Sequence, residues 1–298
     1  MVDRTARTAG ETVIDVPTQA PFYAFLVSDA SELLAAYDAQ VRDRIPDPLP
    51  MGVTVERDGP LVRFLRLGGR GFVVYRDLDG IEGADLDELI ARQVAVFAER
   101  GEAFEWKLHG HDRPEDLSQR LLEAGFEPEE TETVVIAPVP EIAAALELPE
   151  GVSLREATTR ADFEHIAGLE QAVWGEQGQE TWLVEMLDSE RAADPEAITI
   201  VVAEAGATVV CAAWIRFEQG SEFATLWGGA TLPEWRRRGI YRATVAHRAN
   251  VAAERGFRYL EVDASDESRP ILERLGFQAV TTTTPYVWSP PTARTRDS

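Results

Sequence analysis

The fold is decided by residues 231–256, TLPEWRRRGIYRATVAHRANVAAERG, near the end of this 298-residue chain. An apolar strand meets Pro233, a short loop carries three arginines and Gly239, and a helix follows from about Arg238 to Arg255. Backbone N–H groups at a helix start have no acceptor within the helix and point together at one spot. Gly239 would let a ligand approach that backbone closely. The pattern predicts a phosphate-binding helix start; a plain turn with solvated arginines is the alternative.

The rest of the second half alternates strands and helices around this segment. Apolar alternation, helical periodicity and a hairpin signal at Ala205-Gly206 predict the order strand, two helices, three strands, helix, strand, helix, strand. The strand before the loop, EFATLWGGATL, is interrupted by Gly228-Gly229. The predicted elements include a strand from Val152, helices over 160–174 and 180–192, a strand pair over 198–217 and a strand over 257–264.

An internal similarity relates the two halves. The stretch FEWKLHGHDRPEDLSQRLLEAGFEPEETETVVI begins at Phe104, and YLEVDASDESRPILERLGFQAVTTTTPYVW begins at Tyr259. Each predicts a strand, a polar turn, a short helix, a Gly-Phe pair and a Thr-rich strand, and the two Gly-Phe pairs lie 151 residues apart. The first half adds predicted helices over 31–42 and 85–100 and a hairpin around residues 68–71. The sequence therefore predicts a tandem repeat of one fold.

The repeat sets the expected domain boundaries. We expect a first lobe over residues 1–140, a linker over 141–150, a second lobe over 151–290 and a disordered tail over 291–298. Two proline-containing stretches, Pro-Val-Pro and Pro-Glu-Gly, bracket the segment EIAAALEL (141–148), for which a short apolar helix is predicted.

Composition and charge exclude several classes of protein. Lys and Arg number 29 against 52 Asp and Glu, so the formal net charge is −23 and binding to nucleic acid or an anionic membrane is not expected. No apolar run is long enough for a signal peptide or membrane span, and the single cysteine, Cys211, cannot form an internal disulfide. We expect a cytoplasmic monomer or homodimer. His109 and His111 lack further ligands nearby in the sequence, so no metal site is predicted.

The run Pro233-x-x-Arg236-x-x-Gly239-Ile240 resembles the pyrophosphate loop of the GNAT N-acetyltransferase superfamily, whose pattern is Gln/Arg-x-x-Gly-x-Gly/Ala. The element order of residues 151–290 is similar to the whole of that fold. The first half resembles the same fold without a counterpart of residues 236–239. The resemblance implies an α/β fold of the α+β type, with two tandem lobes, each a mixed, mostly antiparallel twisted sheet flanked by helices.

The resemblance also implies how acetyl-CoA would bind. The backbone at the helix start would hold the pyrophosphate, and the strand before it would pair with the pantetheine arm and polarise the thioester carbonyl. Gly228-Gly229 is a natural place for the bulge that splays this strand in the family. The implied cofactor-binding residues are Gly229, Ala230, Thr231, Arg236, Arg237, Arg238, Gly239, Ile240, Tyr241 and Arg242.

The sequence departs from the family pattern at two positions. Tyr241 stands where the pattern has Gly or Ala, and Leu272 stands where a Tyr often serves as general acid. Ser265, Ser268 and Tyr286 are other hydroxyl groups that could donate a proton. A base must take the proton of the amine, and the candidates are the carboxylates Glu261 and Glu222, with Asp263 as a third.

These features predict an acetyl-CoA-dependent N-acetyltransferase. The acceptor would be a primary amine on a small molecule or a peptide, which the acidic composition suggests is cationic. The amine would attack the thioester directly, without a metal. The alternative is a non-catalytic protein of the same fold that binds acyl-CoA as a sensor or serves as an interaction scaffold, and Leu272 together with the eroded first half motivates it.

Overall fold

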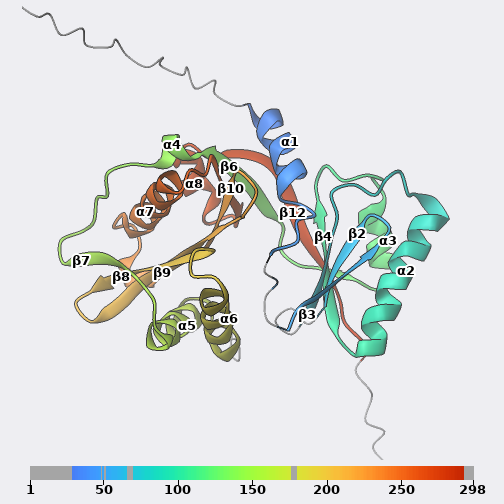
Figure 1. Ribbon diagram of the computed structural model, residues 1–298, viewed down its shortest axis with the longest axis horizontal. Coiled ribbons are helices and arrows are strands. Elements are labelled where there is room, and N and C mark those ends of the chain that lie inside the picture. The colour runs from blue at the N-terminus through green and yellow to red at the C-terminus, as the bar shows by residue number, and fades with distance from the viewer. Residues whose placement is uncertain (1–28, 48, 50–51, 66–69, 176–179, 292–298) are drawn as a thin grey trace, which may run out of the picture.

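The computed structural model describes residues 29–47, 49, 52–65, 70–175 and 180–291. Two lobes lie side by side in Figure 1 and share one sheet. The elements of the first half are α1 (Ala30–Gln40), β1 (Thr54–Asp58), β2 (Leu61–Leu65), β3 (Arg70–Val74), α2 (Gly83–Arg100), β4 (Ala103–His109), α3 (Leu117–Glu123), β5 (Glu127–Pro128), β6 (Glu132–Pro138) and α4 (Val139–Ile142). Those of the second half are β7 (Val152–Glu156), α5 (Arg160–Trp174), α6 (Glu180–Ala193), β8 (Ile198–Ala205), β9 (Thr208–Phe217), β10 (Phe223–Thr231), a 3-10 turn (Pro233–Trp235), α7 (Ile240–Glu254), β11 (Tyr259–Ala264), α8 (Arg269–Leu275) and β12 (Gln278–Trp288).

The predicted fold class is confirmed. The described strands form one 12-stranded sheet in the order β1-β2-β3-β4-β12-β6-β11-β10-β9-β8-β7, with β5 paired to β12. Two of its pairs, β3 with β4 and β10 with β11, are parallel, and the other pairs are antiparallel. Each half therefore places one parallel pair at the same point of its repeat.

Local predictions hold for most elements, one is wrong, and one strand is missing from them. Helix α5 spans the predicted residues 160–174, because Thr159 caps its start reciprocally with Asp162 and Gly175 ends it in the left-handed conformation. The predicted helix over 141–148 is wrong, because α4 ends at Ile142 and Ala143 has an extended backbone. Strand β1 is missing from the prediction, because its sequence TVERD contains a single apolar residue.

The lobes exchange their last strands. Strand β6 of the first half pairs along its length with β11 of the second, and β12 pairs through Thr283–Trp288 with β4 of the first. The exchange is symmetric: Pro128 pairs with Tyr286, and the positions displaced by the 151-residue repeat, Ala279 and Val135, pair with each other. The boundary at residues 140–150 stays a prediction, and the sheet shows that each half is completed by a strand of the other.

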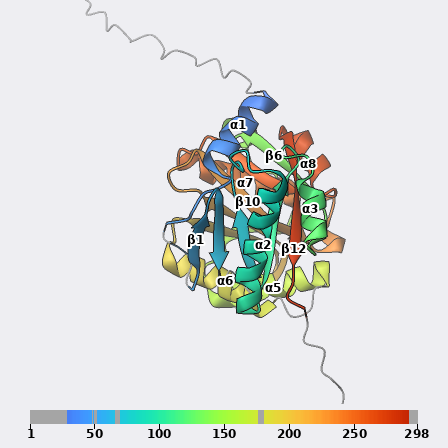
Figure 2. The ribbon, with the colours of Figure 1, turned by 90° about the vertical axis from the view of Figure 1, so that its right-hand side faces the viewer.

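Each lobe has a core on the outer face of the sheet. Helices α2 and α3 cover the first lobe, as Figure 2 shows, and the aromatic rings of Tyr286 and Trp288 from β12 belong to that core. Helices α7 and α8 cover the second lobe, whose core includes Val135 and Ala137 from β6. The exchanged strands thus supply apolar side chains as well as backbone hydrogen bonds.

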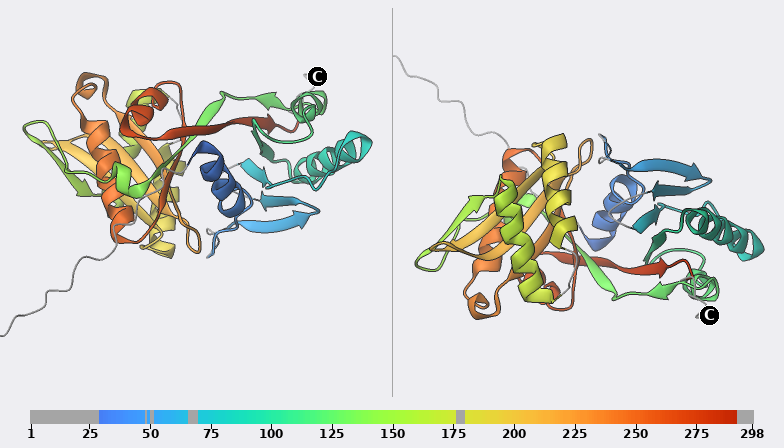
Figure 3. Two further views of the ribbon diagram at one scale, coloured as in Figure 1. Left: turned by 90° about the horizontal axis from the view of Figure 1, so that it is seen from above. Right: turned by 90° about the horizontal axis from the view of Figure 1, so that it is seen from below.

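Helix α1 lies in the angle between the lobes, as both views of Figure 3 show. Its Leu33 and Tyr37 pack on Val134 and Ile136 of β6 and on the aromatic rings at the starts of β10 and β11. Helices α5 and α6 cover the inner face of β8, β9 and β10. The inner face of the central strands is therefore bounded by α1 and by α5 and α6. No described helix is long and apolar enough to cross a membrane.

Candidate functional site

Strand β10 carries a bulge at the predicted position. Its register against β9 shifts between Gly228 and Ala230. Gly228 and Gly229 have positive φ angles, 65° and 103°. A Cβ at Gly228 would lie 2.5 Å from the Trp214 ring, and one at Gly229 would lie 2.6 Å from the Tyr241 ring. The backbone angles and the close rings therefore both require glycine here.

Strands β10 and β11 separate after Thr225, three residues before Gly228. Their parallel ladder covers only Phe223–Thr225 against Tyr259–Glu261, although β10 continues to Thr231 and β11 to Ala264. The edge of β10 that faces β11 thus carries backbone groups without a strand partner among the described residues. An extended ligand chain can pair with such an edge. Gly229, Ala230 and Thr231, predicted to bind pantetheine, all lie on this separated segment.

The loop after β10 presents a set of free amides. A 3-10 turn leads to Arg236, Arg237 takes a left-handed φ of 62°, and Gly239 with a φ of 82° precedes the first residue of α7. Among the described residues, the amides of 237–242 have no hydrogen-bond acceptor. They converge at the positive end of a 15-residue helix. This arrangement suits a phosphate group.

The arginine side chains of the loop differ in what they contact. The Arg236 Nε donates to the Thr231 carbonyl at 3.0 Å, so this guanidinium ties the loop to β10. The Arg238 guanidinium stacks 4.6 Å from the Trp235 ring centroid. Arg237 and Arg242 are exposed. The arginine side chains place positive charge around the free amides of residues 237–242. The amides themselves are the hydrogen-bond donors that could point at a phosphate group.

Tyr241 does not fill the loop. Its ring packs against Gly229 from the α7 side and joins the core of the second lobe. Burial raises the pKa of its hydroxyl above the ordinary value. A bulky residue is accommodated at this position of the pattern because the side chain turns away from the free amides.

A cluster of charges lies on the inner face of the central strands. Glu261 and Asp263 alternate on β11, so both project to one face. Lys107 of β4 forms an ion pair with Asp263 across the two lobes. Burial opposes the charge of Lys107, but the carboxylates of Asp263 and Glu261 outweigh it and raise its pKa. The only lysine of the chain thus comes from the first lobe and neutralises a carboxylate of the second.

Glu261 is a deeply buried carboxylate of this cluster. The residue is 6% exposed. Burial, and then the neighbouring Asp263 carboxylate, raise the Glu261 pKa well above the usual range, while Lys107 lowers it. Elevated carboxyl pKa values are typical of groups that exchange protons during a reaction. The inner face therefore holds a buried carboxyl group with a raised pKa at the level where β10 and β11 part.

Glu132 of β6 belongs to the same cluster and gives a test of it. Burial and the Asp263 carboxylate raise the Glu132 pKa to about 7. The folded protein then holds a proton that the unfolded chain releases near pH 4.5, so Glu132 costs stability as pH rises toward 7. Glu132→Gln is expected to leave stability unchanged near pH 4.5 and to raise it at pH 8 by about 1 kcal/mol, after allowance for partial exposure.

Urea denaturation of both proteins at the two pH values measures this effect. Glu130→Gln, at an exposed position two residues away, is the matched control and should change stability little at either pH. Equal stabilisation by Glu132→Gln at both pH values would contradict the raised pKa.

The other predicted proton-transfer residues lie elsewhere. Glu222 is exposed at the start of β10, where its carboxylate accepts hydrogen bonds from Gln40 at 3.1 Å and Arg258 at 3.3 Å. Leu272 is fully buried in the core of the second lobe. Tyr286 is buried in the core of the first lobe, so it is wrong as a proton donor for the second. Ser265 and Ser268 cap the turn before α8 by bonding to each other.

The remaining features of the sequence have structural explanations. His109 is buried against Tyr37, and burial lowers its pKa to about 2. His111 bonds to Asp38 and Thr281. The described residues contain no cluster of three or more metal-ligating side chains. Cys211 is buried and accepts a hydrogen bond from Thr231.

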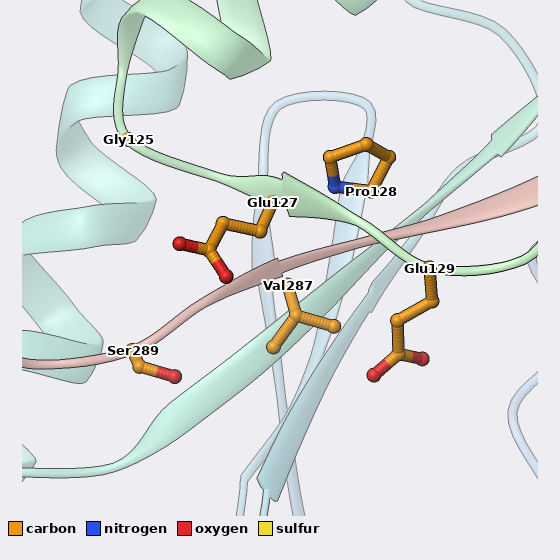
Figure 4. A pocket seen from close by; sticks show the side chains of 6 residues that line it. All are labelled: Gly125, Glu127, Pro128, Glu129, Val287 and Ser289. Carbon is orange, nitrogen blue, oxygen red and sulfur yellow. The ribbon is translucent and has the colours of Figure 1, made fainter.

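A pocket lies beside β5 and β12. In Figure 4, Glu127 of β5 and Glu129 of the segment after it flank Val287 of β12. Its lining includes none of the loop or cluster residues. The splayed strands and the free amides therefore define the candidate site, and this pocket does not.

Comparisons with known proteins agree with this geometry. Residues 163–277 match the model of the acetyltransferase (GNAT) family, a range that contains the bulge, the loop and the charge cluster on β11. A search of curated proteins finds no match.

Solved structures share the fold of most of the chain. A GCN5-related N-acetyltransferase from Kribbella flavida is 16% identical, with a TM-score of 0.60 over 88% of this chain and 94% of its own. A GCN5-related N-acetyltransferase from Sphaerobacter thermophilus is 17% identical, with a TM-score of 0.57 over 77% and 76%. A tandem GNAT protein from the clavulanic acid biosynthesis pathway is 14% identical, with a TM-score of 0.59 over 87% and 94%. The chain thus shares its fold with a tandem GNAT protein, and its residues 163–277 match the model of the acetyltransferase (GNAT) family.

Proposed function

We propose that the chain is an acetyl-CoA-dependent N-acetyltransferase that acts on a cationic primary amine. The observation that carries the proposal is the continuity of the splayed edge of β10 with the free amides of 237–242. The separated edge suits the amide groups of pantetheine, and the helix start suits a pyrophosphate. The second lobe alone would bind the cofactor, because α2 of the first lobe starts after Glu82, with no loop resembling residues 236–239.

The acceptor would reach the thioester from the inner face. Four carboxylates lie there against two cations, namely Glu105, Glu132, Glu261 and Asp263 against Lys107 and Arg70. This excess of negative charge favours a cationic amine. On transfer the amine nitrogen forms a bond to the carbonyl carbon, the carbon–sulfur bond breaks, and CoA leaves as a thiolate. Glu261 takes the proton from the amine, directly or through a water molecule.

The test is thiol release from acetyl-CoA with a panel of amines. Polyamines, aminoglycosides, amino acid amides and peptides with free N-termini cover the cationic acceptors, and neutral hydroxylated compounds serve as the control. The proposal expects release that depends on a cationic amine. Saturable binding of acetyl-CoA without release for any amine would instead support the non-catalytic acyl-CoA sensor, which the buried Leu272 at the usual tyrosine position favours.

Replacement of the base gives a separate prediction. Glu261→Gln is expected to lower kcat by about 100-fold or more, the usual contribution of a general base. Because the pKa of Glu261 is raised, the native rate should climb with pH through an elevated pKa, and the variant should lose this rise. Glu222→Gln discriminates between the candidates. A large loss of kcat in Glu222→Gln together with a native-like pH profile in Glu261→Gln would move the base to Glu222.

A further inference from the structure

A buried arginine lies behind the bulge of β10. Arg248 of α7 is 1% exposed, and no described carboxylate forms an ion pair with it. Its Nε donates to the Thr244 carbonyl at 3.1 Å, within the helix. Its Nη1 donates to the carbonyls of Trp214 at 3.0 Å and Trp227 at 3.1 Å. The guanidinium therefore links helix α7 to strands β9 and β10. Its contact on β10 is the residue just before Gly228.

Simple packing between helix and sheet does not account for this residue. A buried cation is costly, and an apolar side chain of similar size is often as good or better for stability. Arginine keeps its charge even when burial lowers its pKa. The neighbours of Arg248 on the buried side of α7 are small or apolar, such as Val245, Ala249 and Ala252. The two carbonyl contacts are therefore the feature that calls for arginine.

The geometry of the Trp227–Gly228 peptide connects this arginine to the splayed edge. Trp227 pairs with Trp214 in the ladder to β9, and its carbonyl oxygen lies toward that strand and Arg248. The N–H after a carbonyl points to the opposite side of a trans peptide. The Gly228 N–H therefore points toward β11, past the last pair of that ladder at Thr225 and Glu261. An amide on this edge is free to meet a ligand.

We infer that Arg248 is a positioning residue for the acyl group: it fixes the Trp227–Gly228 peptide and polarises the Gly228 N–H that receives the thioester carbonyl. The inference rests on the proposed acetyl-CoA site. A cation that donates to a peptide carbonyl strengthens the N–H of the same peptide as a donor, because hydrogen bonds in a chain polarise one another. An oriented donor of this kind stabilises the negative charge that develops on the carbonyl oxygen during attack.

The test compares three ligands on native protein, Arg248→Met and Arg248→Gln. Acetyl-CoA carries the thioester carbonyl, S-ethyl-CoA is a thioether without it, and CoA has neither group. Calorimetric titration gives the affinity for each. The infrared carbonyl band of bound acetyl-CoA, labelled with ¹³C at the carbonyl, reports the polarisation directly. Arg255→Met is the matched control, since Arg255 follows the same helix and contacts the Glu196 carbonyl and Thr199 instead.

Native protein and Arg255→Met should prefer acetyl-CoA to S-ethyl-CoA by about tenfold, the effect of one well-oriented hydrogen bond, and should shift the carbonyl band to lower frequency than in water. Arg248→Met should bind CoA as the native protein does, lose most of the tenfold preference and return the band toward its position in water. Arg248→Gln, which can still donate to a carbonyl but has no charge, should fall between the two.

Two results would overturn the inference. One is an unshifted band in the native protein, which decides the matter even where a variant fails to fold. The other is a folded Arg248→Met that keeps the native preference and band. Failure of the proposed acetyl-CoA site is distinguishable, because native protein would then bind none of the three ligands.

Discussion

Acetyl-CoA affinity is expected to fall at least about 100-fold in Gly239→Trp, since the loss of even two hydrogen bonds to a charged phosphate has this effect. Gly239 lies at the start of α7, and a Cβ there meets no atom within 4 Å. The indole would therefore project into the space in front of the free amides, where we place the pyrophosphate, without striking the protein. Calorimetric titration measures the loss, and circular dichroism checks that the helix is retained.

Gly239→Ala separates bulk from backbone strain. A residue other than glycine at a φ of 82° is strained by roughly 1–2 kcal/mol, and this strain is common to both variants. The alanine variant should bind acetyl-CoA more weakly than native protein and much more tightly than Gly239→Trp. Equal affinities of native protein and a folded Gly239→Trp would show that the ligand does not approach this backbone.

Neither half of the chain is expected to fold alone. Residues 151–298 would lack β6, which pairs with β11 at six positions and contributes Val135 and Ala137 to the core. Residues 1–150 would lack β12, which pairs with β4 at six positions and contributes Tyr286 and Trp288. Each half would expose a long unpaired strand edge, a common cause of aggregation. Expression of each half separately should give insoluble or unfolded protein by circular dichroism.

The two halves should nevertheless form one particle when both are present. Residues 144–147 are exposed and lie outside helices and strands, so a protease site inserted there tests this. Cleavage should leave the fragments together on gel filtration and should keep cooperative unfolding, because the exchanged strands hold them. A soluble 151–298 fragment that unfolds cooperatively and binds acetyl-CoA would contradict the exchange as a requirement for folding.

The features that sequence alone predicted are local ones. The proline, arginine and glycine pattern of residues 233–239 marks the loop, because a tight approach to a helix start needs those residue types within a few positions. Gly228-Gly229 marks the bulge, since each glycine must tolerate both a positive φ and a nearby aromatic ring. The predicted first and last residues of helix α5 agree with the structure, because the residues that cap its two ends can be recognised in the sequence.

The features that escaped prediction depend on distant parts of the chain. The segment Thr133–Ala137 is apolar enough to pair inside either lobe, so its sequence does not specify that it joins β11. Lys107 and Asp263 are 156 positions apart and meet only because the sheet spans both lobes. From the sequence alone, Arg248 would be expected to lie in solvent. The one local indication that it is buried is the run of small residues, mostly alanine, around this central arginine of α7.

Calorimetric titration of the native protein with acetyl-CoA tests the central claim most directly. The account predicts saturable binding at one site per chain, at the loop of the second lobe, with no second site in the first. Absence of binding would mean that the free amides of residues 237–242 no longer serve a cofactor, and the acetyltransferase proposal would fall with them.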